Sequence, residues 1–371
     1  MRVVLFCHSL ISDWNHGNAH FLRGVAADLV ARGHDVRVYE PHDAWSVVNL
    51  LRDAGPSAIA DFHAAYPMLD SRRVDSGKLD LDEALDGADV VLVHEWNTHP
   101  LVEQIGRHRA AGGRYLLFFH DTHHRSVSDP AAMRSYDLQH YDGVLAFGEV
   151  IRERYVTLGW ARRAWTWHEA ADVERFRPLL AESQGDLVWI GNWGDDERSE
   201  EIRQYLIEPV RALGIQAQLY GVRYPADALD QLGSAGIRYG GWLANYRVPH
   251  VFAAYRATVH IPRRPYVATL PGIPTIRMFE ALACGIPLVS AWWDDAEGLF
   301  REDEDYLVAR TPAKMQSALS RILHEPEYAA SLAASGLETI RRRHTCAHRV
   351  DELFNILGSV RDAREERAFT V

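Results

Sequence analysis

Short apolar runs alternate with helical patterns along most of this 371-residue chain. The first run, VVLFC, leads into a polar loop, and apolar residues at helical spacing then predict a helix from about Asn18 to Arg32. Gly33 ends that helix, and DVRVYEP is the next predicted strand. Such alternation is typical of a parallel sheet with helices on both faces. Further strands are predicted in this half at 88–94, 114–120 and 142–147.

The alternating pattern stops at residues 174–186, a proline-containing stretch with weak periodicity, and then starts again. We therefore predict two α/β domains, residues 1–173 and 184–345, with residues 346–371 packing back on the first. The tail from Thr311 is predicted to be helical in three pieces. The strands expected in the second domain are 186–192, 215–220, 237–241, 257–261, 287–291 and 305–309.

Composition excludes several classes of protein. The formal net charge of −11 argues against a nucleic-acid partner, whose phosphates favour a basic surface. No apolar run reaches the length of about 20 residues that a membrane-spanning helix requires. The three cysteines show no CxxC spacing, so neither a disulfide scaffold nor a structural zinc site is expected. The chain starts with a strand rather than a secretory pattern, and we expect it in the cytoplasm.

The segment Pro271 to Ser290 combines a proline-rich loop, a short helix and an apolar strand. Amides near the start of that helix would be free to bind a diphosphate, and the helix dipole would assist. Glu280 lies in the helix among apolar neighbours and needs a hydrogen-bonded partner, for which we favour a ribose. The predicted donor-binding residues of this segment are Pro274, Thr275, Ile276, Arg277 and Glu280.

A second donor-binding segment is WIGNWGDDERSEE (189–201), a strand followed by a turn at Gly191 and Asn192. Arg198 falls in or near the first turn of the next helix, where it could bind a phosphate through two N–H groups. The alternative is that Arg198 forms a solvated pair with a neighbouring glutamate.

The loop after the first strand contains His16, Gly17 and Asn18, which open the first helix. A glycine there lets a ligand approach the backbone, so we assign these residues to an acceptor or phosphate loop. The alternative is an ordinary turn in which Asn18 caps the helix. The loop is not GxGxxG, which disfavours a dehydrogenase.

Two later loops, HEWNTHP (94–100) and HDTHHR (120–125), place histidines and carboxylates at adjacent strand ends. Glu95, His120 and Asp121 are the candidate catalytic residues, suited to contacts with a sugar or an acceptor hydroxyl. A metal site is an alternative, because histidine and carboxylate side chains bind zinc or iron. No HExxH or other regular ligand spacing occurs, so no metal site is predicted.

Three segments, residues 168–178, 279–290 and 17–41, together resemble family 4 glycosyltransferases. HEAADVERFRP (168–178) is similar to the signature that closes their N-terminal domain, and FEALACGIPLVS (279–290) to their donor-site segment. Residues 17–41 are similar to their first helix and second strand. Within that family, the chain is most similar to the CgeB-like branch. Three motifs carry this similarity: R-x-F-E-A-x-A-C-G at 277–285, I-G-N at 190–192 and T-x-x-H-R at 345–349.

This resemblance implies the GT-B fold: two Rossmann-like domains with parallel sheets facing an interdomain cleft, and a C-terminal helix that crosses back to the N-terminal domain. It implies a retaining, metal-independent transfer of sugar from a nucleotide-diphosphate sugar, of UDP or dTDP type, without a cofactor. The acceptor, a glycan, lipid-linked or small molecule, stays open. Glu280 matches the family's ribose ligand, and Arg198 approximates its diphosphate-binding residue. Where the family has a glutamate eight positions before Glu280, this chain has Gly272.

With retention, the departing phosphate takes the acceptor proton, and His120 or Asp121 positions the sugar. With inversion, a protein base is required, and Asp13, His16, Glu95 and Asp121 are the candidates. Two other functions stay open: a sugar-nucleotide 2-epimerase of the same fold, and a non-catalytic subunit that binds nucleotide sugars.

Overall fold

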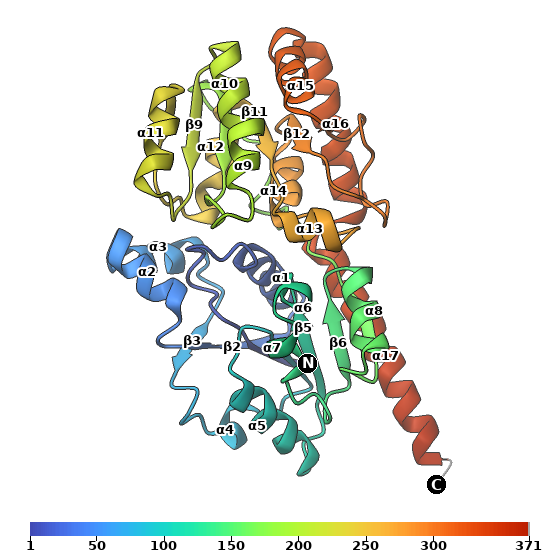
Figure 1. The fold of residues 1–371 in the computed structure, drawn as a ribbon. Coiled ribbons are helices and arrows are strands. Elements are labelled where there is room, and N and C mark those ends of the chain that lie inside the picture. The colour runs from blue at the N-terminus through green and yellow to red at the C-terminus, as the bar shows by residue number, and fades with distance from the viewer. Residues whose placement is uncertain (370–371) are drawn as a thin grey trace. The chain divides into compact units, whose positions relative to one another are not determined.

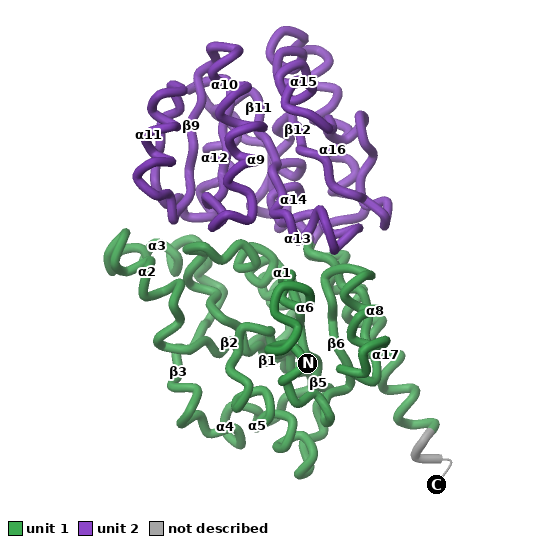
Figure 2. The backbone as a smooth tube through the Cα atoms, in the orientation of Figure 1, with its two compact units in different colours: residues 1–169, 346–371 green, residues 170–345 purple. Residues whose placement is uncertain are grey.

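The computed structural model describes residues 1–369, with side chains up to residue 366. The chain forms two compact units (Figure 2): unit 1 comprises residues 1–169 and 346–371, and unit 2 comprises residues 170–345. The division falls slightly before the predicted boundary at residue 173. The reason is that Ala171 donates its amide to the carbonyl of His344 and bridges to Thr345, both in unit 2.

Unit 1 contains a seven-stranded parallel sheet in the order β3-β2-β1-β4-β5-β6-β7. The central strands are buried on both faces, as their continuous apolar sequences require. The prediction missed β3, whose sequence SRRV is polar, and β7, which has only three residues. The strands are β1 (Arg2–Phe6), β2 (Asp35–Pro41), β3 (Ser71–Val74), β4 (Val90–His94), β5 (Leu116–Asp121), β6 (Gly143–Ala146) and β7 (Ala164–Thr166).

Helices cover both faces of this sheet, and the last helix of the chain belongs to the same unit (Figure 1). Arg32 at the end of α1 pairs with Asp351 of α17, and the indole of Trp167 donates to the carbonyl of Arg349 at 2.8 Å. The predicted return of the C-terminal helix is therefore confirmed. The helices are α1 (Ala19–Ala31), α2 (Trp45–Ala54), α3 (Ser57–Ala65), α4 (Leu81–Ala84), α5 (His99–Ala110), α6 (Arg125–Ser128), α7 (Pro130–Arg134), α8 (Glu149–Thr157) and α17 (Cys346–Phe369).

Unit 2 contains a six-stranded parallel sheet in the order β10-β9-β8-β11-β12-β13. Its core forms where Leu187 and Val259 of the sheet pack against Met315 and Leu319 of a covering helix, all of them buried. All six predicted strands are present, each within a few residues of its predicted ends. They are β8 (Gly185–Ile190), β9 (Ala217–Tyr220), β10 (Ile237–Tyr239), β11 (Tyr255–His260), β12 (Leu288–Ala291) and β13 (Leu307–Ala309).

Glycine and proline residues mark the ends of several helices in unit 2. Gly285, at φ +64°, ends α14 in the left-handed conformation, and Pro326 separates α15 from α16. No helix among residues 1–369 is both long and apolar enough to cross a bilayer. The elements are α9 (Ser199–Ile202), the π-helix η1 (Arg203–Ile207), α10 (Glu208–Leu213), α11 (Ala226–Ser234), the 3₁₀-helix η2 (Asn245–Arg247), α12 (Val248–Ala253), α13 (Arg264–Thr269), α14 (Ile276–Cys284), α15 (Pro312–His324) and α16 (Pro326–Arg343).

Both sheets reverse their strand order at one point, between β1 and β4 in unit 1 and between β8 and β11 in unit 2. In open parallel sheets, ligands bind outside the carboxyl ends of the strands beside such a switch point. The loops that follow these strands are therefore the place to look for a site in each unit. The cleft expected between the two sheets stays a prediction.

Candidate functional site

The N-terminus of α14 is available to an anion. Thr275 occupies the cap position but makes no capping hydrogen bond, and the first turn contains no acidic residue. Its hydroxyl instead contacts Nε2 of His260 at 3.0 Å, and Nδ1 of His260 contacts the Ser290 hydroxyl at 2.8 Å. The amides at the start of α14 thus lack a side-chain partner and carry the positive end of the helix dipole.

Arg198 is held next to this region by backbone carbonyls. Its Nε and Nη2 donate to the carbonyl of Asn192 at 3.1 and 2.7 Å, and Nη1 donates to the carbonyl of Ile261 at 3.1 Å. The guanidinium lies 5.2 Å from the ring centre of Trp189. Because a guanidinium has more N–H groups than these contacts use, Arg198 keeps donors for a further acceptor.

The charge of Arg198 is not neutralised by an ion pair. Among residues 1–366, no carboxylate lies within 4.0 Å of its guanidinium, so the alternative of a pair with a neighbouring glutamate is wrong. Burial, followed by the charge of Arg263, lowers the pKa of Arg198 to about 9. The guanidinium is therefore still cationic at neutral pH, and a bound anion would relieve the cost of its burial.

Two further arginines lie close enough to act on Arg198, since the charges of Arg263 and Arg277 both lower its pKa. Arg263 pairs with Glu197 at 2.6 Å, and Arg277 pairs with Glu280. The three guanidiniums form a basic cluster of which Arg198 is the member without a carboxylate partner.

Glu280 has its hydrogen-bond partners within unit 2. Its side chain is 0% exposed, and it accepts from Asn245 Nδ2 at 2.6 Å and from Arg277. The predicted need for a partner is thus met by Asn245 and Arg277, which removes the reason for invoking a ribose. A ribose contact at Glu280 stays a prediction.

The turn at Gly191 and Asn192 is held in place by hydrogen bonds to other residues of unit 2. The Gly191 carbonyl accepts from the Tyr224 hydroxyl at 2.8 Å, and Asn192 Oδ1 accepts from the Val222 amide at 3.0 Å. A Cβ at Gly191 would lie 2.6 Å from the ring of Trp189. This turn therefore aims the Asn192 carbonyl at Arg198, and its direct contact with a ligand stays a prediction.

Gly272, in the loop before α14, has a physical reason to be glycine. Its φ is +85°, and a Cβ there would lie 2.6 Å from Cγ and Oε1 of Glu297. The carboxylate of Glu297 therefore fills the space that a side chain at position 272 would need.

We predict that Gly272→Ala destabilises the protein by about 1–3 kcal/mol, because alanine would be strained at this φ and would displace Glu297. Urea unfolding measures the change. Gly233→Ala is the matched control, since Gly233 lies in α11 and nothing is within 4 Å of its added Cβ. The control should be neutral or slightly stabilising, and equal effects of the two substitutions would contradict the interpretation.

In unit 1, the ends of β4 and β5 bring Glu95 and Asp121 together, both 0% exposed. Glu95 Oε1 accepts from the Thr122 amide at 3.0 Å, and Asp121 Oδ2 accepts from the Tyr155 hydroxyl at 2.9 Å. Burial raises the pKa of both carboxyls, and the charge of Asp121 raises the pKa of Glu95 further. As the pH rises, the pair of carboxyls therefore keeps a bound proton beyond the pH at which isolated carboxyls would lose theirs.

We predict that Glu95→Gln makes thermal stability less dependent on pH. A raised pKa in the folded state stabilises the fold at low pH, and this contribution is lost as the pH rises through that pKa. The amide mimics the protonated acid, so the wild type should lose more melting temperature than the variant between pH 5 and pH 8. Glu153→Gln, at an exposed position of α8, should follow the wild type, and an unchanged profile for Glu95→Gln would refute the shared proton.

Four buried imidazoles lie in a row at or just after the carboxyl ends of β1, β4 and β5. Ring centres are 5.1 Å apart for His8 and His16, 6.1 Å for His16 and His94, and 5.5 Å for His94 and His120. Burial lowers the pKa of all four, so the rings are neutral at physiological pH. Each has one buried nitrogen without a hydrogen-bond partner.

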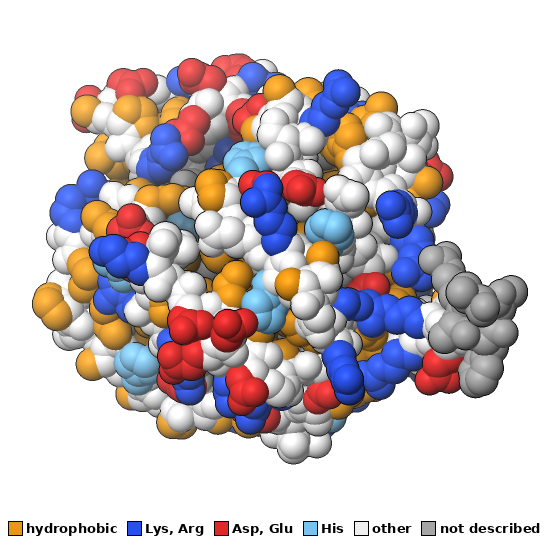
Figure 3. All heavy atoms as spheres, turned by 90° about the horizontal axis from the view of Figure 1, so that it is seen from below, with side chains coloured by type: hydrophobic (Ala, Val, Ile, Leu, Met, Phe, Trp, Pro, Cys, Tyr) orange, Lys and Arg blue, Asp and Glu red, His pale blue; other side chains and the backbone are white. Residues whose placement is uncertain are grey.

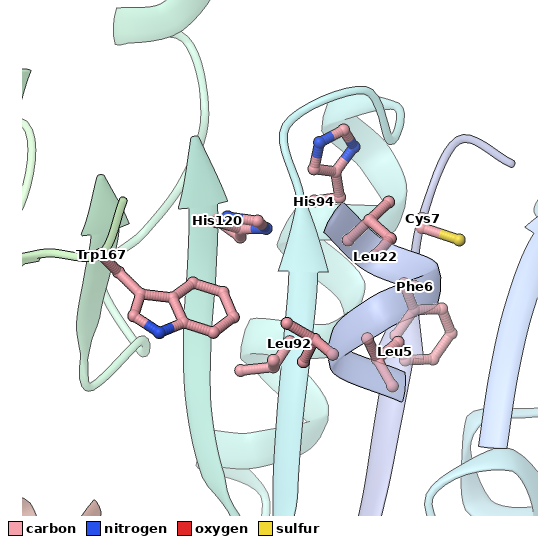
Figure 4. A pocket seen from close by; sticks show the side chains of 9 residues that line it. Leu5, Phe6, Cys7, Leu22, Leu92, His94, His120 and Trp167 are labelled. Atoms are coloured by element: carbon pink, nitrogen blue, oxygen red, sulfur yellow. The ribbon is translucent and has the colours of Figure 1, made fainter. Parts of the chain in front are cut away.

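Figure 4 shows His120 beside Trp167, and His94 farther along the lining of the same small cavity, whose walls are mostly apolar. Among residues 1–366, no three or more His, Cys, Asp and Glu side chains are arranged to hold a metal ion. Neutral imidazoles with unpaired nitrogens are instead suited to hydroxyl groups, to which they can donate or from which they can accept.

The remaining predicted residues, Gly17 and Asn18, lie just before α1. Asn18 holds the cap position but makes no capping hydrogen bond, and its Nδ2 donates to Glu169 Oε1 at 3.0 Å. The side-chain cap considered for Asn18 is thus absent, and contact of this loop with a ligand stays a prediction.

Sequence reasoning missed His260, Asn245, Arg263 and Glu297. His260 had a signal, because it is a histidine near the end of the mostly apolar predicted strand ATVHI. The other three lie in loops or short elements whose partners are distant along the chain, and no spacing pattern marks them.

Comparison with known proteins supports the same fold. A family model described as "Glycosyl transferase-like" matches residues 198–355. Sucrose-phosphate synthase from Thermosynechococcus elongatus is similar in structure at 13% identity, with a TM-score of 0.66 over 98% of this chain and 100% of the other. No curated protein matches the sequence.

Two further similar structures were solved with ligands. Anabaena HepE, solved with UDP and glucose, matches at 14% identity, with a TM-score of 0.67 over 97% of this chain and 100% of the other. An α-glucosyltransferase solved with UDP and a 13-mer DNA matches at 12% identity, with a TM-score of 0.66 over 96% and 99%. The chain thus has the fold of GT-B glycosyltransferases, built from two parallel-sheet α/β units.

Proposed function

We propose that this chain is a glycosyltransferase that uses a nucleotide-diphosphate sugar, with unit 2 binding the donor and unit 1 the acceptor. The observation that carries the proposal is Arg198, a partly buried cation without a carboxylate partner in the described part of the chain. It is linked to the uncapped N-terminus of α14 through Ile261, His260 and Thr275. A diphosphate has the charge and the acceptors that both features require.

In the proposed reaction, the bond between the anomeric carbon and the diphosphate oxygen breaks, and a bond to the acceptor oxygen forms. Arg198, Arg277 and the amides of α14 stabilise the charge that develops on the diphosphate. These groups can balance a leaving diphosphate without a metal ion. We infer retention from the family resemblance, with the acceptor proton passing to the departing diphosphate and His120 or Asp121 positioning the sugar.

Three of the four candidates for the protein base that inversion requires are tied to other groups. Asp13 pairs with the buried Arg23 at 2.8 Å, and Asp121 accepts from Tyr155. Glu95 is buried with a raised pKa. The fourth candidate, His16, keeps a buried Nε2 without a hydrogen-bond partner, so the choice of retention rests on the family resemblance.

The acceptor is proposed not to be a nucleic acid, although one structural neighbour was solved with DNA. The chain carries a formal net charge of −11. On the face shown in Figure 3, acidic and basic side chains are interspersed with apolar and neutral ones. A duplex would favour a continuous basic surface.

Release of UDP from UDP-sugars, measured with and without saccharide acceptors, tests the function. A glycosyltransferase releases UDP faster when an acceptor is present and attaches the sugar to that acceptor. Consumption of the donor at the same rate without acceptor would instead identify a 2-epimerase. Binding of UDP without turnover on any acceptor would identify a non-catalytic subunit.

A further inference from the structure

Three tryptophans and a histidine gather at the strand ends of unit 1. The ring centre of Trp45, the first residue of α2, is 4.5 Å from His8, 6.3 Å from Trp14 and 6.4 Å from Trp96. These residues come from the loops after β1, β2 and β4. The cluster therefore lies at the switch point of the sheet, where an open α/β sheet binds its ligand.

Trp45 is the exposed member of this cluster. Its side chain is 37% exposed, while Trp14 is 6% exposed and donates its indole N–H to Asp53 at 2.7 Å. An exposed indole supported on one side by other rings offers a flat apolar surface at little cost in conformational freedom. The exposed face of Trp45 is thus suited to stacking with a flat ring, and we call this face the Trp45 platform.

Polar groups that need partners lie beside this platform. His8 and His16 are 3% and 5% exposed, and Nε2 of each has no hydrogen-bond partner. Buried polar atoms are almost always paired in folded proteins. The two nitrogens therefore point to a ligand that carries hydroxyl groups, and a purely apolar ligand would leave them unpaired.

The cations that contact these aromatic rings are already paired with carboxylates. Arg52 lies over Trp14 and pairs with Asp53 at 2.8 Å. Arg125 lies over Trp96, with its Nη1 at 3.8 Å from Glu95. A phosphate or carboxylate on the ligand would lose its hydration here without gaining a free cation. This differs from the surroundings of Arg198 in unit 2.

We propose that the acceptor is a neutral saccharide, whose ring stacks on Trp45 and whose hydroxyls pair with the imidazoles of His8 and His16. This inference rests on the proposed function and names the acceptor class. The CH face of a sugar ring suits an indole, and its hydroxyls act as donors and acceptors toward neutral imidazoles.

The test is saturation-transfer NMR on the full chain with methyl glucoside, methyl galactoside, maltose, cellobiose and sucrose. Glucose 6-phosphate and glucuronate are the anionic counterparts. We expect saturable binding of at least one neutral member, about tenfold tighter than of either anion, and about tenfold weaker in Trp45→Ala. Trp292→Ala is the matched control, because Trp292 of unit 2 is also 37% exposed, and it should bind as the wild type does.

His8→Phe and His16→Phe keep a planar aromatic ring, slightly larger than imidazole, and remove the nitrogens, so each should weaken saccharide binding about tenfold. UDP affinity, measured on the same samples, should not change in any of the unit 1 variants. Tighter binding of the anions, no binding by the neutral panel, or no effect of Trp45→Ala would overturn the inference. If UDP still binds and is released from a UDP-sugar in that case, the proposed function stands; if saccharides bind but no UDP-sugar is used, the proposed function fails.

Discussion

Replacing Arg198 with alanine is expected to lower the affinity for UDP on the order of 100-fold, which corresponds to about 3 kcal/mol. The guanidinium is oriented by the carbonyls of Asn192 and Ile261 and stacked on Trp189. Its charge has no carboxylate within 4.0 Å among residues 1–366. A charge-assisted hydrogen bond from such a group to a diphosphate is strong, because both partners are already partly desolvated.

Isothermal calorimetry with UDP measures this loss. Arg198→Lys keeps the charge but cannot span both carbonyls and a phosphate, so it should lose about tenfold. Arg211→Ala removes an exposed arginine from α10 of the same unit and should leave the affinity unchanged. Equal affinities for wild type and Arg198→Ala, in folded protein, would remove Arg198 from the donor site.

Replacing Glu280 with alanine is expected to destabilise the protein by about 3 kcal/mol, since it removes the acceptor shared by the buried Asn245 amide and the partly exposed Arg277 guanidinium. Asn245 and Arg277 both donate to this 0% exposed carboxylate. The melting temperature should fall on the order of 10 °C. Calorimetric or fluorescence-monitored unfolding measures the shift.

The control is Glu197→Ala, which breaks the pair with Arg263 in the same basic cluster. That pair is partly exposed, with side chains that are 21% and 31% accessible, so its loss should cost about 1 kcal/mol or less. Similar effects of the two substitutions would show that Glu280 is not a structural centre of unit 2. A double variant, Glu280→Ala with Arg277→Leu, should recover part of the stability, because it removes the unpaired cation as well.

The fold could be predicted because apolar periodicity, glycine stops and proline breaks all agree along this chain. The strands VVLVH and LLFFH are buried on both faces, and continuous apolar runs of this kind mark the centre of a parallel sheet. The edge strand Ser71–Val74 was not predicted, because a strand at the edge of a sheet needs fewer apolar residues than a central strand.

The site could be predicted only where it depends on position along a strand or helix. Glu95 and Asp121 follow neighbouring strands, so their proximity could be read from the sequence. The partnership of Glu280 with Asn245 could not, because it joins residues 35 positions apart. The contact of Gly272 with Glu297 likewise depends on how two loops fold. Such contacts arise from tertiary packing and leave no local pattern.

We propose that unit 2 binds a nucleotide diphosphate without the help of a metal ion. Titration of UDP into the full-length wild-type protein by isothermal calorimetry, with EDTA present, tests it most directly. We expect saturable binding of one UDP per chain, with an affinity that EDTA does not change. Absence of saturable binding, or binding that disappears when EDTA is added, would contradict the claim.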